Sequence, residues 1–436
     1  YLLIAEKIRC APSYSFVIKY LKAYCHLYLE QGNETEFLLA SITSEPMSNF
    51  CKSHYYQLLG SLHSQRDKHE EAISYFEKAV ETGEHVPSAL LLAANEAEDL
   101  GLPSVRCVFL KNLINVLKED NKILSVFHMR SFPERCLAAL HPDPVVTLAE
   151  AYYLLAKEAL IAQHYIASSE NYSELLSTLK SNYCVVVSKE RPAPLPKTAV
   201  IYHEAALANL KISNFDEALY LCDHMISNHS PTRNQYRQFG IKRKLYSDFN
   251  SQEQDWNNIV SSMDEDVIAL ILASDVLVQK NDYTQAFDHL EKCFNSILEY
   301  KNYNIPQKRA RVESGVPIDK INLLCNCLLA KVLLRKAKIN ETKNLTDSVY
   351  HFYRRALQFS PGDEEVLYNF KIFSQKNTDK DPFILPEKQD VVPVEELQSC
   401  ALKYILESSV KNEEPANTVD PECFIDDDIV NSLFDD

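Results

Sequence analysis

The sequence predicts an all-α chain built from repeated helical hairpins, and three observations support this prediction. Glycine is scarce, with 7 residues in 436, where average usage would give about 30. Because glycine supplies the positive φ angles of β-hairpins, phosphate loops and nucleophile elbows, its scarcity disfavours β-sandwiches, P-loop enzymes and dinucleotide-binding folds. Apolar residues recur with the period of an amphipathic helix. Small residues recur at a fixed position within successive pairs of these helices.

The clearest repeat is YYQLLGSLHSQRDKHEEAISYFEKAVETG, residues 55–83, in which two amphipathic segments flank a polar stretch. In the 34-residue tetratricopeptide repeat, paired helices approach most closely at positions 8 and 20, which need small residues, while positions 4, 7 and 24 need bulky ones. The matching residues are Tyr56 at position 4, Leu59 at 7, Gly60 at 8, Ala72 at 20, Phe76 at 24 and Ala79 at 27. The pattern therefore predicts a tetratricopeptide repeat here.

More degenerate repeats follow in the same phase. Their signature residues are Ala156 at position 8; Tyr202, Ala206 and Ala218 at 4, 8 and 20; Ser274 and Ala286 at 8 and 20; and Ala356 and Pro361 at 27 and 32. We expect Pro231 to lie just past the end of its repeat. The apolar run 321–334 ends early for the last repeat, which predicts an insertion near residues 338–346. Upstream, residues 17–42 read as a hairpin turned at Gly32.

Two regions are expected. Residues 1–375 form a tetratricopeptide-like superhelical solenoid with degenerate repeats, interrupted by insertions at 118–144, 188–197 and 301–318. Residues 376–436 form a helix from Val394 that caps the array, followed by an acidic tail; terminal repeats need caps because their outer face has no neighbour. A generic helical array or bundle is the alternative, because helical periodicity alone does not exclude it.

Charge and cysteine usage restrict the function. The net charge is −16, and residues 376–436 carry −11 of it, so direct nucleic-acid binding is not expected from this chain alone. No apolar run approaches the ~18 residues of a membrane span. The 12 cysteines are scattered without a C-x-x-C pair, which favours reduced, buried thiols. The chain opens at Tyr1 without an initiator Met, and we expect it to be part of something longer.

No residue pattern points to catalysis, a cofactor or a metal. The glycine-rich nucleotide loops, the G-x-S-x-G elbow and the H-E-x-x-H helix are missing from the sequence. Cys222, His224 and His229 suggest zinc, but Cys222 falls at repeat position 24, where apolar bulk is required, and zinc needs a fourth ligand. We therefore favour a core cysteine, and a protein that is not an enzyme.

Three polar segments have two interpretations each. The basic runs 242–244 and 308–311 resemble nuclear-import signals but also suit solvated loops. The acidic segment 420–436 is either a solvating end or a docking segment whose apolar residues enter a partner's groove. Its apolar residues are Phe424, Ile425, Ile429, Leu433 and Phe434, with Val430 beside them.

Whole stretches of the sequence resemble the Fanconi anaemia group G family. The residues that carry this resemblance are YHEAALANLKISNFDEALYLCDHMIS (Tyr202–Ser227), the Gly60 repeat and ALQFSPGDEEVLYNF, residues 356–370. The resemblance runs from about residue 15 to 375 and covers the C-terminal two-thirds of the family's chain, so an N-terminal helical region is expected to precede it. After about residue 394 the predicted helix is similar to the family's, but the very acidic end of the chain departs from it.

The resemblance implies a nuclear, non-enzymatic adaptor, also present in the cytoplasm. Its expected partners are the Fanconi group A subunit and other subunits of the core complex, a ubiquitin-ligase assembly that supports repair of DNA interstrand crosslinks. The alternatives are tetratricopeptide adaptors of meiotic or trafficking assemblies, or a co-chaperone that captures C-terminal carboxylates. The co-chaperone clamp needs Lys and Asn at positions where the Gly60 repeat has Gln57 and Ser61.

Overall fold

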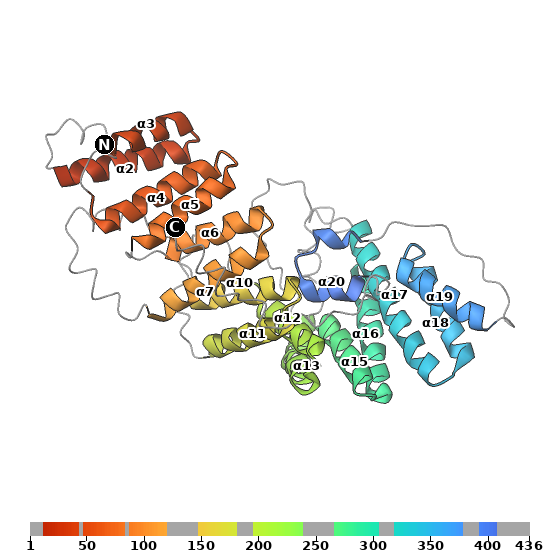
Figure 1. Ribbon diagram of the computed structural model, residues 1–436. Helices are drawn as coiled ribbons and strands as arrows, with labels where there is room; N and C mark the ends of the chain where they lie inside the picture. The colour runs from red at the N-terminus through yellow and green to blue at the C-terminus, as the bar shows by residue number, and fades with distance from the viewer. Residues whose placement is uncertain are drawn as a thin grey trace. The chain divides into compact units, whose positions relative to one another are not determined.

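The computed structural model describes residues 12–42, 47–82, 87–119, 147–180, 195–238, 266–304, 318–377 and 392–407. Every regular element in these ranges is helical, as the sequence predicts. The chain divides into two compact units, Tyr1–Leu195 and Pro196–Asp436 (Figure 1). This division falls within the array predicted for residues 1–375, at the proline-rich segment 188–197. The predicted boundary at 375 and 376 stays a prediction.

Unit 1 contains four helical hairpins in its described residues. Their helices are α2 (Pro12–Tyr28) with α3 (Gly32–Ile42), α4 (Asn49–Ser64) with α5 (His69–Glu81), α6 (Pro87–Asp99) with α7 (Pro103–Glu119), and α10 (Leu148–Ile161) with α11 (Tyr165–Lys180). The second helix of one hairpin packs on the first helix of the next, as α5 does on α6 and α7 on α10. This alternation is the stacking of a helical repeat, in which each hairpin buries its apolar face against its neighbours.

Unit 2 contains three hairpins and three further elements in its described residues. The elements are α12 (Thr198–Lys211) with α13 (Phe215–Gln238), α15 (Asp266–Gln279) with α16 (Tyr283–Asn304), α17 (Ile318–Thr342) with α18 (Thr346–Phe359), then α19 (Glu364–Lys376), a 3₁₀ turn η3 (Val394–Glu396) and α20 (Cys400–Leu406). Helix α13 packs on α15, and α16 packs on α17. One core cluster extends from α15 through α18 to α20, so the unit shares a continuous interior.

All seven described hairpins turn at a residue with left-handed backbone conformation. In the α4–α5 turn, Asp67 has a φ of 55°, and the following N–H, of Lys68, donates to the carbonyl of His63 at 3.0 Å, as in a Schellman motif. The seven residues are Glu30, Asp67, Gly101, Gln163, Ser213, Asn281 and Asn344. Six of them are not glycine. The low glycine content therefore does not mean that these hairpins avoid special backbone conformations; other residues adopt them.

These turns give every hairpin one register. Each left-handed residue follows a small residue by seven positions, as Asp67 follows Gly60 and Ser213 follows Ala206. The small residues of the seven hairpins are Ala23, Gly60, Ala94, Ala156, Ala206, Ser274 and Ala337. The common spacing places each of them at position 8 and each left-handed residue at position 15.

Three local predictions are wrong. Helix α17 continues to Thr342, so residues 338–346 complete the first helix and its turn and hold no insertion. The end of this helix is missed because Lys336 and Asn340 are polar but buried, which interrupts the helical pattern of apolar residues in the sequence. Pro231 lies inside α13, which extends to Gln238, so the proline removes one backbone donor without ending the helix. Gly32 begins α3, and the first hairpin turns at Glu30 instead.

Several predicted features lie outside the described residues. They are the insertions over most of their length, the basic runs 242–244 and 308–311, and the acidic segment with Phe424, Ile425, Ile429, Leu433 and Phe434. Their interpretations stay predictions.

Candidate protein-binding surface

Gly60 marks the closest approach of helices α4 and α5. A Cβ atom added there would lie 2.5 Å from Cε1 of Phe76, inside any real carbon contact, and the Phe76 ring is itself 1% exposed. The sequence predicts the tight contact between positions 8 and 20. The structure places the bulky residue of position 24 directly over position 8, so glycine here makes room for an aromatic ring.

Position 20 contributes a hydrogen bond in two other hairpins. The hydroxyl of Thr35 donates to the carbonyl of Ala23 at 3.4 Å, and the hydroxyl of Ser168 donates to that of Ala156 at 2.9 Å. In both cases position 20 contacts position 8 of the partner helix. Small hydroxyl residues therefore suit this contact as well as alanine does.

The third hairpin has Arg106 at position 20 and uses it differently. Its guanidinium pairs with the carboxylate of Glu158 in α10 at 2.6 Å and with that of Glu98 at 2.7 Å. Arg106 and Glu158 are both buried. A buried ion pair thus links the third hairpin to the fourth, where the sequence shows only a missing small residue.

The signature residues lie between helices and do not form a binding site. Tyr56 and Leu59 are partly buried. The hydroxyl of Ser274, at position 8 in α15, donates to the carbonyl of Ile271 at 2.6 Å. The fully packed members are Ala72, Phe76, Ala79, Ala156, Tyr202, Ala206, Ala218, Ser274, Ala286, Ala356 and Pro361. Their role is to set hairpin geometry, and the partner-facing residues must lie elsewhere.

Residues 392–407 lie against the first helices of three successive hairpins in unit 2. Helix α20 contacts α12, α15 and α17 (Figure 1), and we call the surface that these helices turn toward it the first-helix face. The helix predicted from Val394 to cap the array begins as a 3₁₀ turn, and its helical part does not cap the last hairpin. Helix α19 packs on α17 and α18 instead. The sequence does not predict the first-helix face, because no local pattern marks which segment folds back onto these three helices.

Polar side chains of the first-helix face hold this segment. The backbone N–H of Cys400 donates to Oε1 of Glu204 in α12 at 3.3 Å. The hydroxyl of Tyr404 lies beside Asp275 of α15, whose negative charge, together with burial, raises the pKa of Tyr404. Asp275 in turn accepts two hydrogen bonds from Arg335 of α17, at 2.8 and 3.0 Å. Tyr404 therefore lies beside the Asp275 carboxylate, and Arg335 from a different helix holds that carboxylate in place.

Further contacts fix both ends of the segment. The ammonium of Lys211 in α12 lies 4.7 Å from the centre of the Tyr404 ring, a cation–π geometry. At the other end, the backbone of Val392 hydrogen-bonds Cys327 of α17, whose thiol pKa is raised by burial. Between them, Leu402 and other apolar residues enter the core of unit 2. The segment thus spans the whole first-helix face.

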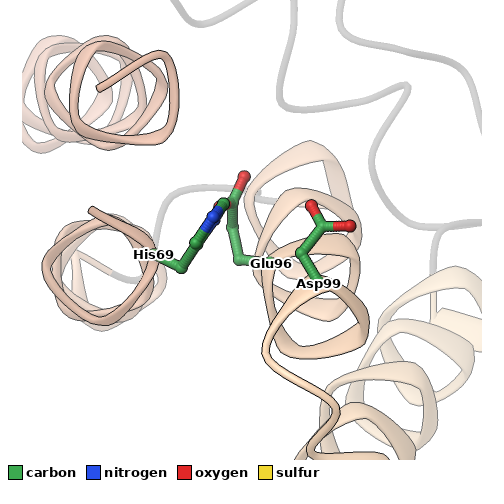
Figure 2. A group of neighbouring side chains, drawn as sticks. All are labelled: His69, Glu96 and Asp99. Atoms are coloured by element: carbon green, nitrogen blue, oxygen red, sulfur yellow. The ribbon is translucent and has the colours of Figure 1, made fainter. Parts of the chain in front are cut away.

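His69, Glu96 and Asp99 form a group of metal-ligand type in unit 1. Figure 2 shows the imidazole of His69, from α5, pointing toward Glu96 on α6, with Asp99 farther along that helix. Their ligand atoms lie within 4.8 Å of one another. Both oxygens of Glu96 already have partners, His69 Nδ1 at 2.7 Å and the Ser64 hydroxyl at 2.6 Å. The group therefore serves as a junction between the second and third hairpins.

Cys222 lies in the core, as the repeat position predicts. It is 1% exposed, and burial raises the pKa of its thiol. His224 stacks on Tyr202 with ring centres 4.8 Å apart. This side chain packs within its own hairpin.

Comparison with known proteins agrees with this geometry. Residues 53–82 match the sequence family described as tetratricopeptide repeat, and residue 53 is position 1 of the numbering that Gly60 sets. The fold is that of the tetratricopeptide repeat. Proteins with this fold are typically non-catalytic scaffolds that bind protein partners. No curated protein matches the sequence significantly.

None of the described helices is long and apolar enough to cross a bilayer.

Several solved structures match this chain over most of its length, with low sequence identity and low TM-scores. A tetratricopeptide repeat protein from Parabacteroides merdae is 13% identical, with 83% of this chain and 99% of that chain covered and a TM-score of 0.33. The quorum sensor NprR from B. thuringiensis, in its apo form, is 12% identical over 82% and 91%, with a TM-score of 0.30. The TPR2AB domain of yeast Sti1, in a pHSP90 complex, is 14% identical over 68% and 96%, with a TM-score of 0.22.

Proposed function

We propose that this chain is a non-catalytic adaptor subunit of the Fanconi anaemia core complex. In this role it bridges the group A subunit to other subunits of the ubiquitin-ligase assembly and so supports repair of DNA interstrand crosslinks. The observation that carries the adaptor role is the first-helix face, on which charged side chains from three helices converge on one short segment. The choice of complex rests on the resemblance of Tyr202–Ser227, the Gly60 repeat and residues 356–370 to the Fanconi group G family.

The location and partners follow from the same proposal. The chain acts in the nucleus, with a cytoplasmic pool, and it reaches DNA through its partners, since a net charge of −16 opposes direct contact with phosphates. Membrane partners are not part of this role. The basic runs 242–244 and 308–311 support nuclear import.

The co-chaperone alternative is disfavoured by the second hairpin. A carboxylate clamp needs side chains that point into the open groove, but Gln57 at position 5 is 3% exposed and accepts a hydrogen bond from Ser88 at 3.1 Å. This amide is engaged with the next hairpin and carries no positive charge. Meiotic and trafficking adaptors remain as outcomes of the experiment below.

Affinity purification from nuclear extract with quantitative mass spectrometry tests the proposal. Wild-type chain is compared with the Gly60→Arg variant, which disrupts a hairpin contact, and with Gly32→Ala, which replaces a glycine that has room for a methyl group. We expect wild type and Gly32→Ala to recover the group A and other core subunits, and Gly60→Arg to lose them. Recovery of chaperones or membrane-coat proteins in their place contradicts the proposal.

A further inference from the structure

The segment 392–407 resembles a bound ligand more than a structural end. It reaches the first-helix face from far along the chain, since Cys400 follows Glu204 by 196 positions. Three of its buried residues, Leu397, Leu402 and Ile405, are at most 2% exposed, while Glu395 and Glu407 are exposed. The segment is therefore amphipathic, with one face fully covered by the surface that a repeat protein offers to partners.

The first-helix face meets this segment with charged groups as well as apolar ones. Glu204 accepts from a backbone N–H of the segment, and Asp275 and Arg335 form a pair beside its tyrosine. Charges are costly in an interior that never opens, because they must be desolvated. On a surface that exchanges ligands, the same charges are hydrated when the face is free and orient the ligand when it is bound.

The segment has little stability of its own. Helix α20 comprises seven residues, below the ~12–15 that an isolated helix needs to be even marginally stable in water, so its order comes from docking. In the sequence the segment follows α19, which ends at Lys376. Docking of the segment is intramolecular because the segment belongs to the same chain, and its release requires only local opening, without global unfolding.

We propose that the first-helix face is a binding groove for a helical segment of a partner protein and that residues 392–407 occupy it in cis. The partner segment has the chemistry of the occupant: aliphatic residues at the positions of Leu402, Ile405 and Leu406, and a tyrosine at that of Tyr404. The tyrosine hydroxyl meets Asp275, and a backbone N–H meets Glu204. The inference rests on the proposed adaptor function and adds its regulation: partners bind in proportion to the fraction of chains whose segment is released.

Competition in trans tests this inference. The probe is a fluorescein-labelled peptide of residues 392–407, added to the full chain and to a full-chain variant, Leu402→Asp/Ile405→Asp, whose own segment cannot dock. We expect the variant to bind the peptide at least about tenfold more tightly than wild type, because its groove is open. The matched control, Glu395→Ala, changes an exposed position of the same segment and should bind as wild type does. A released, folded variant that does not bind the peptide overturns the inference.

Asp275 reports whether the peptide uses the groove. Asp275→Asn in the released variant removes the charge beside the tyrosine and should weaken peptide binding at least about fivefold. Equal binding with Asp275→Asn places the peptide elsewhere and contradicts the inference.

Hydrogen exchange of the wild-type chain gives an answer even if the released variant does not fold. We expect the amides of α20 to exchange well before those of α15 and α17, since the segment opens locally. If the amides of α20, α15 and α17 all exchange only through global unfolding, residues 392–407 are an integral part of the core, and the inference is overturned. Neither result depends on which complex the adaptor serves, so a failed search for Fanconi subunits leaves this test intact.

Discussion

At the scale of single residues, two glycines of the chain have opposite environments. A Cβ at Gly60 meets the Phe76 ring at 2.5 Å, whereas a Cβ at Gly32 meets only Leu62 and Arg66 at 3.5 Å or more. We predict that Gly60→Ala lowers the free energy of unfolding by about 1–3 kcal/mol through overpacking, and Gly60→Arg by more. Gly32→Ala should change it by less than about 0.5 kcal/mol. Urea unfolding of the three variants measures this; equal stability of both alanine variants contradicts the predicted contact.

The left-handed residues of the turns give a second prediction at this scale. Gln163 has a φ of 64°, a conformation that costs a side-chain-bearing residue about 1–2 kcal/mol. Glycine adopts it freely but loses about 0.5–1 kcal/mol of unfolded-chain entropy. We therefore expect Gln163→Gly to stabilise the protein by roughly 0.5–1 kcal/mol.

The adjacent residue is the matched control for this prediction. Ala162 has a φ of −73°, where glycine brings no relief, so Ala162→Gly should destabilise. Thermal unfolding of both variants decides the question, and equal losses in both would show that Gln163 is not strained.

At the scale of elements, an ion pair joins the third and fourth hairpins of the described array. Replacing Arg106 by Met leaves Glu158 buried without its partner, and we predict a loss of about 3–5 kcal/mol. Replacing Glu158 by Met as well should recover most of this loss, because no buried charge then remains. A double variant as unstable as the single one, in urea unfolding, contradicts the interpretation.

A surface pair provides the comparison for Arg106. Arg66 and Glu36 lie 2.8 Å apart, but the Glu36 side chain is 60% exposed. Arg66→Met should therefore cost at most about 1 kcal/mol. The contrast between the two arginines measures how much burial, rather than contact distance, decides the effect.

The junction of α5 and α6 has a predictable pH dependence. The hydrogen bond to Glu96 raises the pKa of His69 above its ordinary 6.5, with Asp99 and Asp67 adding to the effect and desolvation opposing it. A raised pKa in the folded state means that the pair stabilises the protein fully below pH 6.5 and loses its contribution as the pH rises through the higher folded value. NMR titration of the His69 ring should show this midpoint, and Glu96→Gln should lower it. A wild-type midpoint at or below 6.5 contradicts the interpretation.

The sequence predicts the helices and turns of a hairpin only where its small residues and its apolar period indicate the same register. Gly60, Ala156, Ala206 and Ser274 set a register that the turns of the structure share. The end of α17 is missed because buried Lys336 lies over the rings of Phe287 and Phe294, 5.1 Å from each centre. A lysine in an aromatic environment breaks the apolar period without leaving the core.

At the scale of the whole molecule, the candidate site is the part that the sequence does not predict. Its groups come from α12, α15, α17 and α20, and the contact between Glu204 and Cys400 joins residues 196 positions apart. No local pattern encodes such a pairing, because each residue suits an ordinary helix surface. The sequence does indicate the residues that hold each hairpin together, because the packing of two neighbouring helices requires particular residue sizes at fixed positions.

The proposal that this hairpin array is a protein adaptor of the Fanconi core complex can be tested by calorimetric titration of the purified chain with purified group A subunit. We predict saturable binding with a defined stoichiometry and a negative heat-capacity change, as expected when apolar surface is buried. The heat of binding should disappear for Gly60→Arg and persist for Gly32→Ala. The absence of binding at micromolar concentrations, with circular dichroism showing a folded wild-type chain, would contradict the claim.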